Sequence, residues 1–162
     1  MSHYLVQAHN IKKYFSIKGG VFWHEIGKIY AVDDVSLTIK KGETVGLVGE
    51  SGCGKTTLGR TITSLYKATG GEVLFEGKNI FQMKKQDLRA LRRDMQMIFQ
   101  DPFESLNPRH TIGTILEEPF IIHHIGTKPE RKKKIEFLLE NVGLAKDVLH
   151  RYPHEFSGGQ RQ

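Results

Sequence analysis

The residues with the clearest chemical meaning form one glycine-rich stretch, which reads Gly49, Glu50, Ser51, Gly52, Cys53, Gly54, Lys55 and Thr56. This order matches the pattern G-x-x-x-x-G-K-[ST], in which backbone N–H groups wrap around a phosphate. Lys55 is expected to reach the β- and γ-phosphates of a nucleotide, and the Thr56 hydroxyl to bind Mg²⁺. Thr57 is expected near the α-phosphate, whereas Cys53 fills a variable position and is not expected to act as a nucleophile. The stretch therefore predicts a nucleotide phosphate site.

Two elements must hold this loop in place. Residues 44–48 form a short apolar run that is rich in β-branched residues and bounded by glycine, which is typical of a buried parallel strand. A helix is expected at about 54–66, because Leu58, Ile62 and Leu65 recur at spacings of four and three. A strand, a glycine loop and a helix start form the setting in which this pattern binds phosphate, and the helix N-terminus adds partial positive charge.

The rest of the chain is expected to begin with strands and end with helices. Strands are expected at residues 4–15, 29–40, 72–75 and 95–99, with a loop at 19–28. Helices are expected at 86–93, at 111–124 and from Thr127 to Gly143. In the last helix Thr127 and Glu130 have the spacing of a capping box, and one apolar face is formed by Ile135, Leu138, Leu139 and Val142. This order predicts an α/β core followed by a helical part.

The composition excludes several classes of protein. The 162 residues, with 38% hydrophobic and 26% charged, have the balance of a globular domain and not of a disordered chain. We expect no membrane span and no export signal, because no run reaches about 18 apolar residues and the start lacks a signal pattern. The single cysteine excludes an internal disulfide. The net charge of +6 fits nucleic acid, anionic lipid or polyphosphate, and it does not choose among them.

Two further segments narrow the class of phosphate-loop protein. Residues 97–102 consist of three apolar residues followed by Gln100, Asp101 and a proline. Near the end of the chain, residues 152–162 contain Ser157, Gly158, Gly159 and Gln160. The order of phosphate loop, apolar strand ending in glutamine, helical segment and Ser-Gly-Gly-Gln resembles the ATP-binding subunits of ABC transporters. The resemblance runs from about Tyr4 to the last residue.

The resemblance also points to one branch of that family. Four segments look like the dipeptide and oligopeptide importer branch, and most like the second of its two ATPase subunits: residues 31–37, 46–55, 101–109 and 152–155. Two residues depart from the pattern of the branch. Thr56 stands where serine is usual, which keeps the hydroxyl, and Phe156 stands where leucine is usual.

The resemblance implies roles for individual residues. ATP and Mg²⁺ are the implied cofactors, with the loop residues 49–57 around the phosphates and with Thr56 and Gln100 on the metal. Lys55 and Gln100 are the implied catalytic residues, and Gln100 is also implied to help hold the attacking water. Phe15, or failing it Tyr14, is implied to stack on adenine, although packing in the core is the other interpretation. The Ser-Gly-Gly-Gln segment is implied to be the signature motif of the family, which completes a nucleotide site on the opposite subunit. It consists of Ser157, Gly158, Gly159 and Gln160.

The fold and the assembly follow from the same resemblance. The implied fold class is α/β, a P-loop ABC ATPase domain with an N-terminal antiparallel β part, an incomplete parallel core and a helical subdomain. Residues 1–100 are expected to form the ATP-binding core and residues 101–162 the helical subdomain. The implied partners are a second ATPase subunit in a head-to-tail pair, two membrane-spanning permease subunits and, indirectly, an external peptide-binding protein, with no nucleic acid. The implied location is the cytoplasmic face of the cell membrane.

Hydrolysis in this family needs an apolar strand that ends in Asp-Glu, followed later by a histidine. Neither motif occurs before Gln162. We therefore expect an N-terminal fragment of a longer subunit, in which nucleotide binds weakly and is not hydrolysed. Whether the transported substrate is a dipeptide, a longer peptide or a nickel chelate stays open.

Three alternatives stay open at this point. A small P-loop kinase would use Asp101 to hold Mg²⁺, but such a kinase gives Ser157 to Gln160 no task. A nucleic-acid-binding module rests on charge alone, because the sequence has no zinc-finger, RNP or helix-turn-helix pattern. An ABC ATPase that works on DNA or ribosomes would keep the fold without the transporter, and the importer-like segments argue against it.

Overall fold

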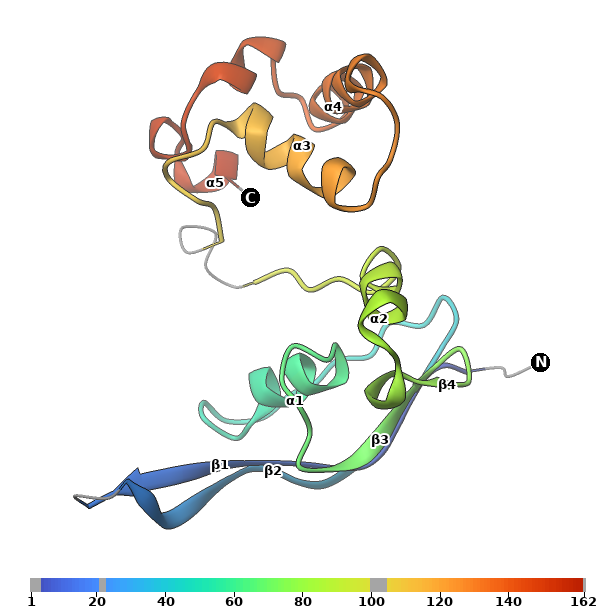
Figure 1. Cartoon of the computed structure of the whole chain (residues 1–162), viewed down its shortest axis with the longest axis vertical. Coiled ribbons are helices and arrows are strands. Elements are labelled where there is room, and N and C mark those ends of the chain that lie inside the picture. The colour runs from blue at the N-terminus through green and yellow to red at the C-terminus, as the bar shows by residue number, and fades with distance from the viewer. Residues whose placement is uncertain (1–3, 21–22, 100–104, 162) are drawn as a thin grey trace. The chain divides into compact units, whose positions relative to one another are not determined.

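The computed structural model of the protein describes residues 4–20, 23–99 and 105–161. These residues fall into two compact units, one within residues 1–97 and the other within residues 98–162 (Figure 1). The first unit holds a β-sheet and short helices, and the second unit is helical. Within the described residues, no helix combines the length and the apolar character needed to cross a membrane.

The first unit is built on a long β-hairpin. Strand β1 (Tyr4–Gly19) pairs antiparallel with β2 (His24–Lys40) along nearly its whole length. On its other side β1 pairs antiparallel with β3 (Gly70–Phe75), which in turn pairs with β4 (Lys78–Asn79). The order in this sheet is β2-β1-β3-β4. Strand β1 is therefore a central strand, and its position determines where its side chains lie.

The predicted loop at residues 19–28 is wrong over most of its length. Strand β1 runs on to Gly19 and β2 begins at His24, so the hairpin extends beyond both predicted strands. The Ser16 hydroxyl donates to Glu25 Oε2 at 2.6 Å across the ribbon. Pairing across the two strands satisfies the backbone groups of residues whose own propensities do not favour a strand, which is why the local pattern missed the extension.

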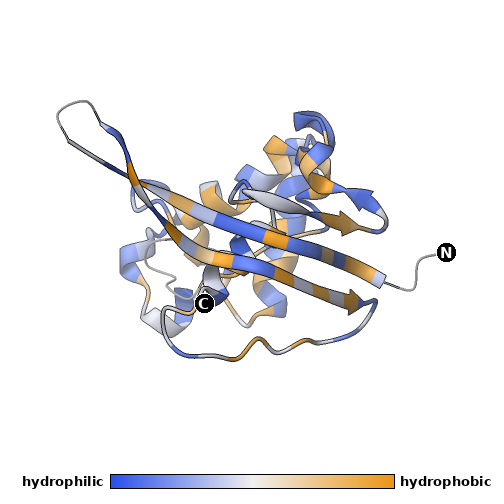
Figure 2. Cartoon of the chain, turned by 90° about the horizontal axis from the view of Figure 1, so that it is seen from below, coloured by the Kyte–Doolittle hydropathy of each residue, from blue (hydrophilic) through white to orange (hydrophobic). Residues whose placement is uncertain are grey.

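One face of the sheet is covered by helix α1 (Lys55–Ile62), as Figure 1 shows. The buried core combines both elements and consists of Val6, Ala8, Ile11, Val32, Leu58, Val73 and Ile80. Ile11 on β1 and Val73 on β3 are both 0% exposed. Polar and apolar residues alternate along β1 and β2 in Figure 2, which is the pattern of strands with one buried face. Two short helical segments, η1 (Ile80–Gln82) and α2 (Lys85–Leu91), follow the sheet.

Two strands that the sequence predicts do not form. Residues 44–48 and 95–99 form no strand, and neither segment belongs to the four-stranded sheet of the described residues. The apolar side chains of 44–48 stay in solvent, and Val48 is 93% exposed. In the second segment Ile98 is 97% exposed, whereas Met95 and Met97 are half-buried. A parallel strand needs neighbouring strands that accept its hydrogen bonds, and the described residues place no such strand beside either segment. The apolar pattern alone could not supply that partner.

The helical unit contains α3 (Ile112–Ile122), α4 (Lys128–Asn141), two short 3₁₀ turns, η2 (Lys146–His150) and η3 (Pro153–Glu155), and the single turn α5 (Gly158–Arg161). Its core is formed by Ile135, Leu139, Val148 and Phe156. The predicted capping box of α4 is confirmed, because Glu130 accepts from the Thr127 backbone N–H at 2.7 Å. The predicted apolar face is narrower than expected. Leu138 and Val142 are 48% and 70% exposed, since the core of this unit covers α4 only along the line of Ile135 and Leu139.

The contrast between the core and the exposed apolar run leads to a stability prediction. Replacing Ile11 by alanine should lower the free energy of unfolding by about 2–5 kcal/mol, because Ile11 is fully buried. Replacing Val48 by alanine should change it by less than about 0.5 kcal/mol, because that side chain is in solvent. Urea unfolding followed by circular dichroism measures both. A large loss for Val48→Ala would contradict the exposed position of residues 44–48.

Candidate phosphate-binding site

The glycine-rich loop is fixed to the sheet by a backbone contact at Gly54. This residue caps α1 with φ +95°, a left-handed conformation that favours glycine. A Cβ atom placed on Gly54 would lie 2.1 Å from the carbonyl oxygen of Ala31 on β2. Only a glycine can therefore bring the start of α1 this close to the strand. The contact places the loop beside Val32, which belongs to the buried core.

The ammonium group of Lys55 is directed back into the loop. Its Nζ donates to the carbonyl oxygens of Gly49 at 2.7 Å and Glu50 at 2.5 Å, and it lies 3.5 Å from Cys53 Sγ. The backbone N–H of Cys53 donates to Glu50 O at 3.4 Å and closes the turn. A positive charge at a glycine-rich turn before a helix is a donor set that suits a phosphate chain. A Cβ on Gly49 would lie 2.7 Å from Cys53 Sγ, so the thiol contacts the loop backbone.

Helix α1 begins directly after this loop. The backbone N–H of Leu58 donates to Gly54 O at 2.8 Å, and the buried Thr61 hydroxyl donates to the carbonyl oxygen of Thr57 at 2.7 Å. Leu58 is 4% exposed and anchors the helix in the core. Thr56 lies exposed in the first turn, next to Lys55. An exposed hydroxyl beside a lysine at a helix start fits a phosphate-bound Mg²⁺ ion, which takes oxygen ligands.

The two candidate aromatic residues lie on opposite faces of β1. The rings of Phe15 and Tyr66 pack edge-to-face, with ring centroids 5.6 Å apart and an interplanar angle of 87°. Tyr66 follows α1, and its hydroxyl accepts from Arg60 of that helix at 2.8 Å. The Tyr14 hydroxyl instead donates to Asp33 at 2.5 Å, and its ring packs against Tyr30. Because neighbouring residues of a strand point to opposite faces, only Phe15 shares the α1 face with the phosphate loop.

The Ser-Gly-Gly-Gln segment lies at the end of the helical unit. The backbone N–H of Gln160 donates to Ser157 Oγ at 3.4 Å, and Gln160 Oε1 accepts from the Ser157 N–H at 3.1 Å. This reciprocal pair is a capping box for the short turn α5. Phe156, the residue before it, is 7% exposed and belongs to the core. The segment is therefore held by a buried anchor on one side and by its own cap on the other.

Two residues of the predicted site cannot be placed. Both lie outside the described part of the chain: Gln100, which is implied to act on Mg²⁺ and water, and Asp101, which is the metal residue of the kinase alternative.

Sequence reasoning also missed the contacts of Tyr66 and Lys13 with Phe15. A lone tyrosine after a helix and a lysine in a strand have no motif, so only the folded arrangement reveals them.

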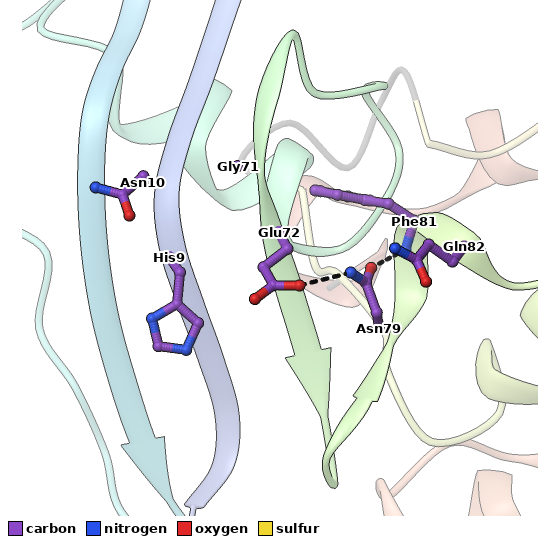
Figure 3. A pocket seen from close by; sticks show the side chains of 7 residues that line it. All are labelled: His9, Asn10, Gly71, Glu72, Asn79, Phe81 and Gln82. Carbon is purple, nitrogen blue, oxygen red and sulfur yellow. Dashed lines mark hydrogen bonds between the residues drawn. The ribbon is translucent and has the colours of Figure 1, made fainter.

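A cavity of about 410 Å³ lies elsewhere on the first unit, over β1, β3 and η1 (Figure 3). Its lining includes His9, Glu72 and Asn79. The Asn79 amide donates to Glu72 at 2.8 Å, and Asn79 Oδ1 accepts from the Phe81 N–H at 3.0 Å. The lining contains a carboxylate and no lysine or arginine. It therefore does not suit a phosphate chain, and its Asn79 side chain caps η1.

Comparison with known proteins places the chain in a family. The family profile described as "ABC transporter" matches residues 32–162. The chain is 52% identical over 159 residues to the oligopeptide transport ATP-binding protein AppF of Bacillus subtilis, covering 98% of this chain and 48% of AppF. It is 44% identical over 158 residues to the dipeptide transport ATP-binding protein DppF of Haemophilus influenzae, covering 98% and 48%. The chain thus spans about half the length of these curated relatives.

Solved structures of ABC cassettes also resemble this chain. The ATP-binding cassette MJ0796, in a dimeric post-hydrolysis state bound to ADP and Pi, is 31% identical to this chain with a TM-score of 0.79. The alignment covers 96% of this chain and 65% of that one. A second dimeric structure of MJ0796, a bacterial ABC transporter cassette, has a TM-score of 0.78 at 30% identity. The predicted α/β fold class is confirmed by these likenesses.

The Gly54 contact predicts a difference between two glycines of the same loop. Both Gly52 and Gly54 have positive φ, but a Cβ on Gly52 would meet no atom within 4 Å. Gly52→Ala should therefore cost only about 1 kcal/mol of stability, from backbone strain. Gly54→Ala adds the clash with Ala31 O and should cost clearly more. Urea unfolding of the two variants measures the difference, and equal losses would contradict the tight contact between the loop and β2.

The hydrogen bond to Asp33 leads to a pH prediction for Tyr14. Donation to the carboxylate stabilises the protonated phenol and raises the pKa of Tyr14 from 10.0 to about 12. The folded state therefore holds this proton more tightly than the unfolded state does. The stabilisation is complete below pH 10 and is lost as the pH rises through about 12.

Tyrosinate absorbance of the folded chain measures this pKa. The wild-type titration should show a late tyrosine component, which Tyr14→Phe removes and Asp33→Asn moves to lower pH. Tyr152→Phe, in the helical unit, is the matched control, and it should leave the late component in place. A late component that survives in Tyr14→Phe would refute the assignment.

Proposed function

The chain belongs to the ABC transporter family, and on this premise we propose that it is the ATP-binding, energy-coupling part of a subunit that drives peptide import. The proposal for peptides is supported by relatives that are named oligopeptide or dipeptide transport ATP-binding proteins and are 43–52% identical to this chain. Whether a dipeptide, a longer peptide or a nickel chelate is transported is proposed to depend on the external binding protein and the permease subunits of such a system. The metabolite-kinase alternative gains no support, because it rests on Asp101 alone.

The observation that carries this proposal is the packed phosphate loop. Gly54 lies against the backbone of β2, and Lys55 Nζ lies among the loop carbonyl oxygens at 2.5–2.7 Å. In this proposal residues 49–57 surround the phosphates of ATP, and Lys55 neutralises the charge of the β- and γ-phosphates. Thr56 binds the Mg²⁺ ion, which itself offsets phosphate charge when bound. Gln100 is proposed from the sequence alone to reach the same ion and the attacking water.

Phe15 is the proposed contact for the adenine base. It lies on the α1 face of the sheet, with Lys13 Nζ 4.7 Å from its ring centroid. Lys13 pairs across the hairpin with Val32, the residue beside the Gly54 contact. Phe15 is two residues farther along β1, which is about 7 Å in an extended strand. The adenine base at Phe15 and the phosphates at Lys55 would thus bind on the same face of the sheet.

The helical unit is proposed to contribute to a second nucleotide. Ser157, Gly158, Gly159 and Gln160 would contact ATP held by another ATPase subunit in a head-to-tail pair. Support comes from MJ0796, which is dimeric in its solved structure. In the proposed assembly residues 1–100 are the ATP-binding core and residues 101–162 the helical subdomain. Two permease subunits, and indirectly an external peptide-binding protein, complete an importer whose ATPase lies on the cytoplasmic face of the membrane.

This chain by itself is proposed to bind nucleotide without steady-state hydrolysis. The 162 residues contain no apolar run that ends in Asp-Glu, the motif that would hold the metal through water and polarise the attacking water. The phosphate loop needs neither group to bind a triphosphate. This chain is therefore expected to bind ATP and not to hydrolyse it.

Lys55→Ala tests the proposal. It should weaken Mg·ATP binding to the 162-residue chain at least about 10-fold, because a charge-assisted contact to phosphate is lost. Lys41→Ala is the control, since the Lys41 side chain is 84% exposed and lies in the turn after β2. Isothermal titration calorimetry measures affinity, and a phosphate-release assay should detect no turnover. Equal affinity of Lys55→Ala and wild type would overturn the proposed site.

A further inference from the structure

We propose that Tyr66 and Lys13 are positioning residues for the nucleotide base: they hold the ring of Phe15 so that one of its faces receives the base. This inference rests on the proposed ATP-binding function and adds two residues to it. Neither residue lies in the glycine-rich loop or in the Ser-Gly-Gly-Gln segment. Both act through Phe15 and need no contact with the nucleotide.

Tyr66 packs edge-to-face with this ring. The two centroids are 5.6 Å apart with an interplanar angle of 87°, which is a favourable edge-to-face arrangement. Tyr66 is itself held by Arg60, whose Nη1 donates to the Tyr66 hydroxyl at 2.8 Å and whose guanidinium lies 5.5 Å from the ring centroid. Its backbone N–H donates to Arg60 O at 2.9 Å. The orientation of Phe15 is therefore tied to helix α1.

Lys13 covers one face of the same ring. Its ammonium lies 4.7 Å from the Phe15 centroid and 5.8 Å from the Tyr66 centroid. It is anchored there because Nζ donates to the carbonyl oxygen of Lys67 at 3.0 Å. A cation over one aromatic face is attracted by the ring quadrupole. The base then stacks on the other face, and the cation draws electron density away from that side.

The arrangement connects the two ends of a bound nucleotide through one short helix. Lys55 is the first residue of α1 and serves the phosphates, while Arg60 in its last turn holds Tyr66 and so Phe15. Phe15 is only partly buried. Without these contacts its ring would have to be ordered when the base binds, which lowers affinity. Pre-ordering the ring is the gain that Tyr66 and Lys13 provide.

The test compares two probes that differ only in the base end. Mg·ATP carries the base, whereas Mg·tripolyphosphate offers the phosphates without base or ribose. Tyr66→Leu should weaken Mg·ATP binding about 2- to 10-fold, and Lys13→Met about 2- to 5-fold. Both variants should bind Mg·tripolyphosphate as wild type does. Tyr66→Phe, which keeps the ring, should restore most of the affinity for Mg·ATP.

Calorimetry on the 162-residue chain separates the outcomes. Tyr30→Leu is the control, because Tyr30 packs on Tyr14 at the opposite face of the sheet, and it should change neither probe. Unchanged Mg·ATP affinity in Tyr66→Leu and Lys13→Met would overturn the inference, as would an equal loss for both probes. If Tyr66→Leu fails to fold, Lys13→Met and Tyr66→Phe decide alone. Tripolyphosphate binding that resists Lys55→Ala would defeat the proposed function itself.

Discussion

The close approach of Gly54 to the carbonyl oxygen of Ala31 is the constraint on which the candidate site depends. A side chain at Gly54 would collide with β2 at 2.1 Å, so glycine alone lets the loop lie against the strand. Because residues 44–48 form no strand within the described chain, the loop is not held from the side that precedes it. The contact with β2 and the start of α1 therefore set the direction in which Lys55 and the loop N–H groups point.

The buried core carries this local constraint to the rest of the first unit. Leu58 of α1 packs with Ile11 and Val32 of the hairpin, so the helix cannot move away from the sheet without losing buried apolar area. The same helix holds the phosphate loop at its first residue and Tyr66 beyond its last turn. One packed interface thus orders the phosphate end and the base end of the proposed site. The long hairpin contributes Phe15 and Lys13 from the strand at its centre.

In the helical unit, a buried residue and a local cap hold the Ser-Gly-Gly-Gln segment in place. Phe156 is buried beside Ile135, Leu139 and Val148, and the residues after it project from that anchor. The cap between Ser157 and Gln160 then defines the first turn of α5. Burial on one side and a local cap on the other keep two glycines in a defined place. A Ser-Gly-Gly-Gln segment without these supports would be an ordinary flexible loop.

The sequence by itself determined the features that depend on neighbours along the chain. The phosphate-loop pattern, the helix that starts after Gly54 and the Thr127–Glu130 capping box are read from residues a few positions apart. The structure has the cap as expected and the helix start as expected, but the helix ends at Ile62, short of the expected residue 66. The order of strand-like and helix-like segments also predicted the α/β class, and the family resemblance implied the same class. Only the tertiary structure decided that Phe15 rather than Tyr14 faces α1, that the hairpin extends past residues 15 and 29, and that the apolar run at 44–48 stays in solvent. The physical reason is that strand pairing and side-chain facing depend on hydrogen-bond partners far away in sequence, whose presence and register no local pattern contains.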